Sequence, residues 1–80
     1  MKLYVGNFIY ATTEKELKRL FSSYGSVIDV RIIHDQFTRQ SKCFGYVEML
    51  VRGDGKEAIN QLNGKKVNER HLVVKEAVRV

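Results

Sequence analysis

The sequence lacks proline altogether and contains a single cysteine, Cys43. One cysteine cannot form an intramolecular disulfide or supply a set of thiolate ligands, so we expect a reducing compartment and no metal ion. No tract rich in glycine, serine or arginine marks a linker or a disordered tail. Because no internal repeat is present either, we expect one domain over residues 1–80.

Long apolar runs are also missing. None approaches the roughly 18 residues that identify a membrane-spanning helix, and the chain begins with a strand pattern rather than with a signal peptide. We therefore expect a cytoplasmic monomer without membrane contact. A chain this short buries only about 60% of its unfolded surface, which favours a simple two-layer fold over a fold with a deep catalytic cavity.

Catalytic motifs are absent as well. His34 and His71 stand in no pattern with a serine, cysteine or carboxylate that would indicate a nucleophile and its base. Residues 53–56 (GDGK) share glycine and lysine with phosphate-binding loops but lack the spacing of a P-loop. We expect neither enzymatic activity nor a cofactor.

Positive charge is in excess. The 14 Lys and Arg residues outnumber the 9 Asp and Glu residues, so the net charge is +5 and the isoelectric point is about 9.6. This balance favours polyanionic partners, nucleic acids among them. Charge alone discriminates poorly, because many small basic proteins bind nothing in particular.

Two aromatic residues in the segment 42–49 (KCFGYVEM) fall on a polar face. Successive side chains on a strand point to opposite sides. Phe44 and Tyr46 therefore share one face with the charged residues at the two ends, while Val47 and Met49 enter the core. An exposed aromatic pair is typical of a binding surface.

The segment 2–8 (KLYVGNF) repeats the pattern, because Tyr4 falls on the side of Lys2. If the two strands are neighbours in one sheet, Tyr4, Phe44 and Tyr46 form an aromatic platform bordered by basic side chains. Every base has a π-face, and stacking on an aromatic side chain is worth about 1–3 kcal/mol per base. A single aromatic in a strand is more often a packing residue, but three on one polar face indicate a ligand.

The first helix is predicted between the two aromatic strands. Thr13 and Glu16 form a capping box. Apolar residues then recur at helical spacing as far as Tyr24, with Phe21 in the core, and Gly25 is expected to end the helix in the left-handed conformation.

The second helix has a weaker signal. Asp54 and Glu57 predict its start, and Asn63 with Gly64 ends it. Gly55 lies in its interior, where glycine costs about 0.5–1 kcal/mol relative to alanine.

Two further strands complete the pattern. Residues 27–33 form a strand with Arg31 on the polar face, and the polar residues 34–41 connect it to the segment 42–49. After a turn-rich stretch with a small hairpin around Val67, residues 72–76 form the last strand, with Lys75 on the platform side.

The order strand, helix, strand, strand, helix, strand belongs to the split βαβ arrangement. We therefore expect an α+β protein with a ferredoxin-like βαββαβ fold. Its four-stranded antiparallel sheet should carry both helices on one face and leave the other face open.

Residues 42–49 also resemble the octamer of the RNA recognition motif, whose pattern is a basic residue, glycine, aromatic, glycine or alanine, aromatic, aliphatic, any residue, aromatic. Cys43 replaces the first glycine and Met49 replaces the last aromatic. Residues 3–8 resemble the shorter hexamer of the family, with Phe8 where leucine is commoner. The resemblance runs from residue 1 to about 77. A small chain with a single domain resembles the bacterial members of the family.

The resemblance implies a protein that binds single-stranded RNA. It implies that Tyr4 and Phe44 each stack a base, that Tyr46 packs against a sugar or between two nucleotides, and that Lys42 contacts phosphate. The family pattern often has glycine where Arg39 stands, which leaves the turn geometry open. Further backbone contacts or stacking from the sides are expected from the other basic residues: Lys2, Arg31, Lys75, Arg39 and Arg79.

Two alternatives remain open. Some members of the family use the same fold to bind a protein, and here that partner would be unknown. Single-stranded DNA also fits, because stacking does not read the 2′-hydroxyl group.

Overall fold

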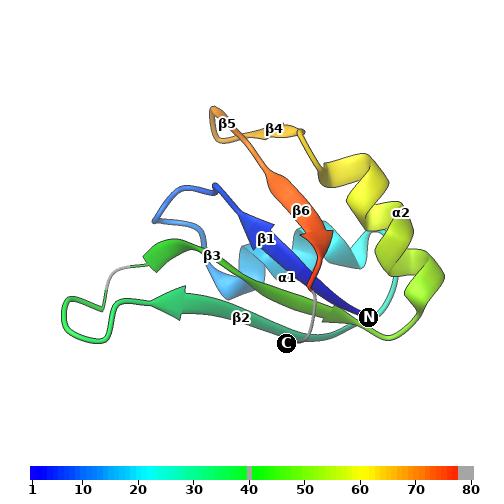
Figure 1. The fold of residues 1–80 in the computed structure, drawn as a ribbon, viewed down its shortest axis with the longest axis horizontal. Coiled ribbons are helices and arrows are strands. Elements are labelled where there is room, and N and C mark those ends of the chain that lie inside the picture. Colours follow the sequence, from blue (N-terminus) through cyan, green and yellow to red (C-terminus); the bar gives the residue numbers. More distant parts are fainter. Residues whose placement is uncertain (40, 78–80) are drawn as a thin grey trace.

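The computed structural model of the protein describes residues 1–39 and 41–77. Strands β1, β2, β3 and β6 form one antiparallel sheet in the order β2-β3-β1-β6, while β4 and β5 form a small hairpin. The expected βαββαβ order and four-stranded sheet are confirmed (Figure 1). The elements are β1 (Lys2–Gly6), α1 (Glu14–Ser22), β2 (Val27–His34), β3 (Ser41–Met49), α2 (Arg52–Leu62), β4 (Lys66–Val67), β5 (Arg70–His71) and β6 (Val73–Glu76).

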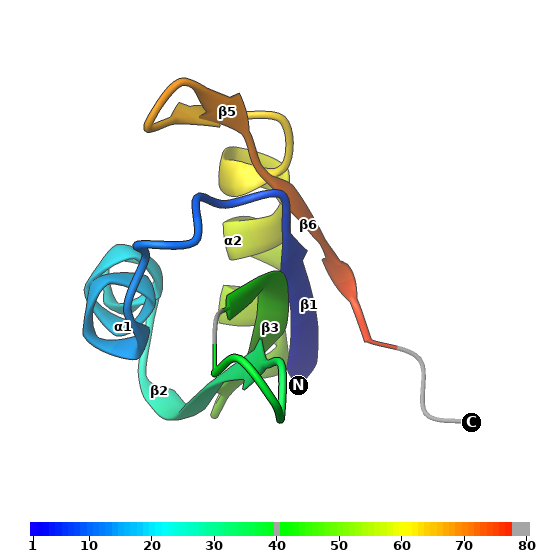
Figure 2. The same cartoon turned by 90° about the vertical axis from the view of Figure 1, so that its left-hand side faces the viewer.

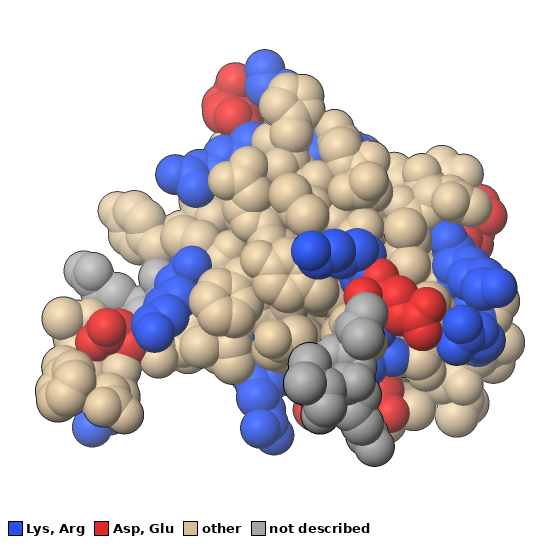
Figure 3. Space-filling model, in the orientation of Figure 1, with Lys and Arg blue, Asp and Glu red and all other residues tan. Residues whose placement is uncertain are grey.

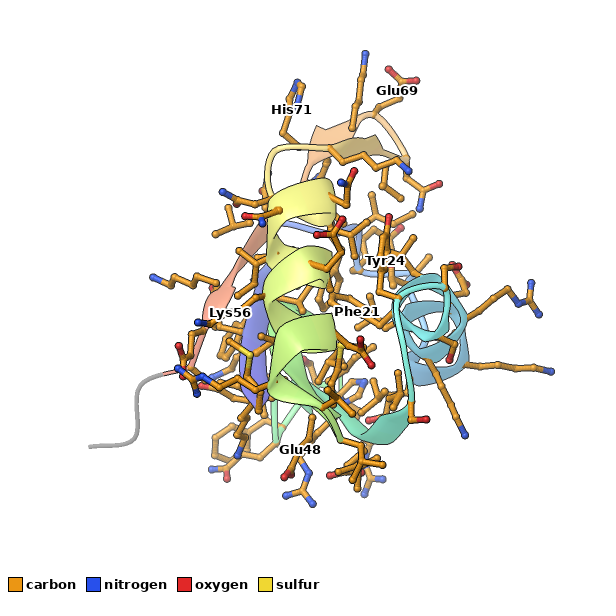
Figure 4. All side chains as sticks on the ribbon, turned by 90° about the vertical axis from the view of Figure 1, so that its right-hand side faces the viewer. Phe21, Tyr24, Glu48, Lys56, Glu69 and His71 are labelled. Atoms are coloured by element: carbon orange, nitrogen blue, oxygen red, sulfur yellow. The ribbon has the colours of Figure 1, made fainter. Side chains whose placement is uncertain are left out.

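Both helices lie on one side of the sheet, and no described element covers the opposite side (Figure 2). Phe21 of α1 is fully buried, as expected, and lies with Tyr24 between the two helices (Figure 4). Burial of an aliphatic or phenylalanine side chain contributes about 1.5–3 kcal/mol, so this core fixes which sheet face is inside. Its strand residues include Leu3, Val5, Ile32, Val47, Met49 and Val74.

The N-cap hydrogen bond of the capping box predicted for α1 is present. Thr13 Oγ1 accepts a hydrogen bond of 3.1 Å from the backbone N–H of Glu16. Glu14 Oε2 accepts a hydrogen bond of 2.9 Å from the backbone N–H of Ile32 on the edge strand β2. The first turn of α1 therefore also covers a donor on an edge that other chains could otherwise pair with.

The predicted end of α1 was wrong in its detail. The helix ends at Ser22, and its cap residue Ser23 keeps a right-handed conformation. Gly25 has a φ of +157°, outside the left-handed helical region. A Cβ at Gly25 would collide with the carboxylate of Asp54. Glycine is thus needed here for a φ that other residues rarely adopt and for the close approach of α2, and it does not form the predicted left-handed cap.

The predicted start of the second helix was also wrong. α2 begins at Arg52, and its cap residue Val51 makes no side-chain hydrogen bond. Asp54 lies within the first turn, where its charge complements the positive end of the helix dipole. Gly55, expected to weaken the helix, is buried against the side chain of Met1. Its small size therefore has a packing use that the propensity argument could not see.

Asp35 organises the connection between β2 and β3. Its Oδ1 accepts hydrogen bonds from the backbone N–H groups of Phe37 at 2.9 Å and Thr38 at 3.0 Å, and its carbonyl oxygen accepts one from Arg39 at 2.8 Å. The bonds from Thr38 and Phe37, followed by the charge of Lys42, hold the pKa of the Asp35 carboxyl below its usual value. Arg39 adopts a φ of +63°, the conformation that glycine would reach more readily.

Strand β3 is irregular at Cys43. The register shifts between the pairs Ile32–Gly45 and His34–Ser41, and Cys43 has a φ of +64°. The alternation that we expected through 42–49 is therefore interrupted at Cys43. The side chain of Cys43 still packs against the core, as its inward parity predicted, but it is only half-buried.

Gly45 lies where the backbones of β2 and β3 leave no room for a side chain. A Cβ at this position would collide with the carbonyl oxygen of Arg31 and would lie 3.0 Å from the Cα of Ile32. These are backbone atoms, so no side-chain rotation can relieve the contact. The glycine in the middle of the octamer is thus required by the path of β2.

Gly45→Ala should therefore lower the free energy of unfolding by about 1–3 kcal/mol, because β2 must shift to admit the methyl group. Gly53→Ala is the matched control. Nothing lies within 4 Å of a Cβ at that helical position, so alanine there should raise the free energy of unfolding by about 0.5–1 kcal/mol. Urea unfolding measures both variants. A Gly45→Ala protein as stable as the wild type would contradict the close approach.

Arg39→Gly should raise the free energy of unfolding by about 0.5–1 kcal/mol, because a left-handed conformation costs a non-glycine residue about 1–2 kcal/mol and glycine returns part of this gain as unfolded-state entropy. Gln36→Gly, in the same connection but without a positive φ, should lower the free energy of unfolding by up to about 1 kcal/mol. Thermal unfolding monitored by circular dichroism compares the two. Equal losses in both variants would show that the conformation of Arg39 carries no strain.

Candidate nucleic-acid interface

The strand register aligns a row of side chains across the uncovered sheet face. Tyr4 of β1 is directly opposite Tyr46 of β3. On the far side of Tyr46 lies Arg31 of β2, and on the far side of Tyr4 lies Lys75 of β6. The row thus has two aromatic rings at its centre and one cation at each end.

Phe44 completes the aromatic platform. Its ring centroid lies 5.9 Å from that of Tyr4, with the two planes 27° apart. Tyr46 meets both rings edge-on, at 6.1 Å and 70° from Tyr4 and at 6.4 Å and 90° from Phe44. All three side chains are half-buried. Tyr4 and Phe44 therefore present two nearly parallel faces side by side.

Gly6 allows the ring of Tyr4 to lie flat. In the pairing of β1 with β3, Gly6 is opposite Phe44. A Cβ at Gly6 would lie 2.6 Å from the hydroxyl oxygen of Tyr4 and 2.9 Å from its Cε1. The ring of Tyr4 therefore extends over Gly6 toward Phe44. The sequence contained this signal, because residues two apart on a strand share a face.

Two lysines lie over rings of the platform. Lys2 Nζ is 5.1 Å from the centroid of Tyr46, and Lys75 Nζ is 5.2 Å from the centroid of Tyr4. Both distances are within the cation–π range, and such contacts are worth about 0.5–1 kcal/mol at exposed sites. The parity argument had placed both lysines on this face.

Two shallow hollows open beside the platform. In Figure 3, which views this face, blue Lys and Arg side chains surround a tan centre. The larger hollow, of about 420 Å³, is lined by Tyr4, Tyr46, Lys75, Glu76 and Ala77. The smaller hollow, of about 130 Å³, is lined by Lys2, Asp29, Arg31, Tyr46 and Glu48.

The other predicted contact residues lie apart from the rings. Lys42 is exposed, and its charge acts on Asp35. It therefore lies toward the connection between β2 and β3, where Arg39 is also exposed. Arg79 falls outside the described residues, so the structure does not place it.

Sequence reasoning missed two exposed aromatic side chains. Phe37 is 85% exposed in the connection after β2, and Tyr10 is 74% exposed in the connection after β1. We had interpreted the connection after β2 (residues 34–41) only as a polar loop. The available signal was a single phenylalanine within the otherwise polar residues 34–41.

Among residues 1–39 and 41–77, no group of three His, Cys, Asp or Glu residues could hold a metal ion. Within the same residues, no helix is long and apolar enough to cross a membrane.

Comparison with known proteins identifies the family. The family model for the RNA recognition motif matches residues 3–73. The chain is 41% identical over 76 residues to glycine-rich RNA-binding protein 10 of Brassica napus, a match that covers 95% of this chain and 45% of that protein. The chain spans less than half the length of the curated relatives that it matches.

Solved structures give the same result. The crystal structure of RNA binding protein PG1 matches with a TM-score of 0.96 and 40% identity, over 100% of this chain and 96% of that one. The Sxl-lethal protein/RNA complex matches with a TM-score of 0.94 and 30% identity, over 99% of this chain and 47% of that one. The family model, the identities and the fold agree, and the chain belongs to the RNA recognition motif family.

Proposed function

We propose that the aromatic platform binds single-stranded RNA by stacking one base on Tyr4 and another on Phe44. The observation that carries this proposal is the pair of nearly parallel rings, 5.9 Å apart, on a sheet face that no described element covers. Membership of the family supports RNA as the ligand. So do the similar proteins, which are named as RNA-binding or were solved in a protein/RNA complex.

Stacking on this surface requires the lysines to move. Lys75 lies over Tyr4, so an incoming base and the ammonium group compete for the same ring face. A stacked base is worth about 1–3 kcal/mol and an exposed cation–π contact about 0.5–1 kcal/mol, so the base displaces the lysine. The freed ammonium group stays beside the site, where it can pair with a phosphate. Lys2 lies over Tyr46, so its ammonium group is also beside the site and can pair with a phosphate.

The remaining residues surround these two base sites. Tyr46 meets Tyr4 and Phe44 edge-on, so it packs against a sugar or between two nucleotides rather than offering a parallel stacking face. Arg31, Lys42 and Arg39 supply positive charge for the backbone. Because every base has a π-face, the site tolerates many sequences, and a platform of this size accommodates about two to four nucleotides.

A second candidate function is protein binding on the helical side. A hollow of about 360 Å³ lies there between α1 and the β4-β5 hairpin, and Leu17, Leu20 and Val67 line it. Thr12 Oγ1 also borders this hollow, is buried, and has no hydrogen-bond partner among the described residues. This function requires neither an aromatic platform nor the basic residues around it, so mutation of the platform separates the two candidates.

Phe44→Ala should weaken binding of a random single-stranded RNA pool by about 1–3 kcal/mol, the value of one stacked base. The slope of log K against log salt should stay unchanged, because no phosphate contact is lost. Lys42→Ala should instead lower that slope by about 0.7, the increment for one phosphate contact on a single strand. Fluorescence anisotropy across a salt series measures both.

Lys18→Ala serves as the charge control, because Lys18 is an exposed lysine of α1, on the covered side of the sheet. It should leave both the affinity and the slope unchanged. Wild-type affinity in a folded Phe44→Ala protein would disprove stacking, and the same series with a DNA pool reports which nucleic acid is preferred. Thermal melts establish that each variant is folded.

A further inference from the structure

Two exposed aromatic rings lie beyond the same end of the sheet. β1 and β2 both pair antiparallel with β3, so their C-terminal ends point the same way. Tyr10 follows β1 and Phe37 follows β2. Figure 1 shows the connection after β2 reaching past the beginning of β3, whereas the connection after β1 turns back toward α1. Both connections are therefore candidates to continue the aromatic surface of the open face at this end.

The two connections run in different directions. Figure 2 shows the connection after β1 turning toward α1, away from the open face, whereas the connection after β2 stays close to the plane of the sheet. The connection that carries Phe37 therefore extends the sheet along β3, while the connection that carries Tyr10 leads to the helical side. This difference makes Phe37 the candidate and Tyr10 its matched control.

The backbone around Phe37 is fixed by hydrogen bonds within a turn, and its ring is exposed to solvent. Asp35 Oδ1 accepts the backbone hydrogen bonds of Phe37 and Thr38, and the Asp35 carbonyl accepts that of Arg39. A phenylalanine that is 85% exposed adds little to the stability of the core. A rigid turn that presents such a ring resembles the preorganised contacts of binding surfaces, which lose little conformational freedom when the ligand arrives.

The position of Phe37 fits a strand of RNA that leaves the platform past Phe44. The connection starts at the His34–Ser41 pair, three residues from Phe44 along β3, which is at most about 10 Å at the rise of a regular strand. Lys42 lies between the two aromatic positions in the chain and acts on Asp35, and Arg39 is exposed in the same turn. Lys42 and Arg39 thus provide positive charge between the positions of the two rings, where the phosphate between two stacked bases would lie.

We propose that Phe37 stacks one further base of the RNA, with Lys42 and Arg39 beside the intervening phosphate. This inference rests on the proposed function of the platform. It adds to the RNA site a contact that lies beyond the sheet. The ligand is the same single-stranded RNA, and the contact is sequence-tolerant because it uses only the π-face of a base.

The test compares two random-sequence RNA pools, one of about three nucleotides, which covers the platform alone, and one of about eight nucleotides, which reaches the turn. Fluorescence anisotropy gives the affinity of each folded variant for both pools. Phe37→Ala should weaken binding of the longer pool by about five- to tenfold and leave the shorter pool unchanged. Phe37→Tyr should bind as the wild type does, whereas Phe37→Leu should show the loss seen with alanine, because leucine has no π-face.

Tyr10→Ala should bind both pools as the wild type does, and Phe44→Ala should weaken both. Wild-type affinity of Phe37→Ala for the longer pool, with the loss in Phe44→Ala intact, would overturn the extension and leave the platform function standing. It would point to a protein contact for Phe37. An equal loss for both pools, or wild-type affinity in Phe37→Leu, would also overturn it. Undiminished binding by Phe44→Ala would refute the proposed function itself.

Discussion

The antiparallel pairing of β1 with β3 is the constraint on which both the fold and the candidate site depend. One register places Leu3 opposite Val47 in the core and Tyr4 opposite Tyr46 on the open face. A slip of one residue would exchange the two faces and bury the aromatic rings. The hydrophobic core therefore also determines the geometry of the aromatic platform.

Two glycines determine the shape of this surface as much as the aromatic rings do. Gly6 gives Tyr4 the room to lie beside Phe44, and Gly45 lets the backbone of β2 pass close to β3. The two glycines differ in what a methyl group would meet. At Gly6 it would meet the mobile end of one side chain, whereas at Gly45 it would meet fixed backbone. Substitution at the first position thus disturbs the ligand surface, and substitution at the second disturbs the sheet.

The platform could be predicted from sequence because β3 is regular from Phe44 onward and charged residues mark its outer face. The left-handed conformation of Cys43 could not, because it depends on the path of β2 and a cysteine does not indicate it. The start of α2 at Arg52 was missed because no capping side chain marks it. Cytoplasmic location, the monomeric state and the contact of Arg79 stay predictions.

An NMR titration with short single-stranded RNA tests most directly the central claim that bases lie on the sheet. Backbone amide shifts report which element the RNA contacts first. The largest early changes should map to β1 and β3, around Tyr4 and Phe44, with smaller changes at Lys75 and Arg31. Largest changes along α1, from Glu14 to Ser22, would place the ligand on the helical side and contradict the account.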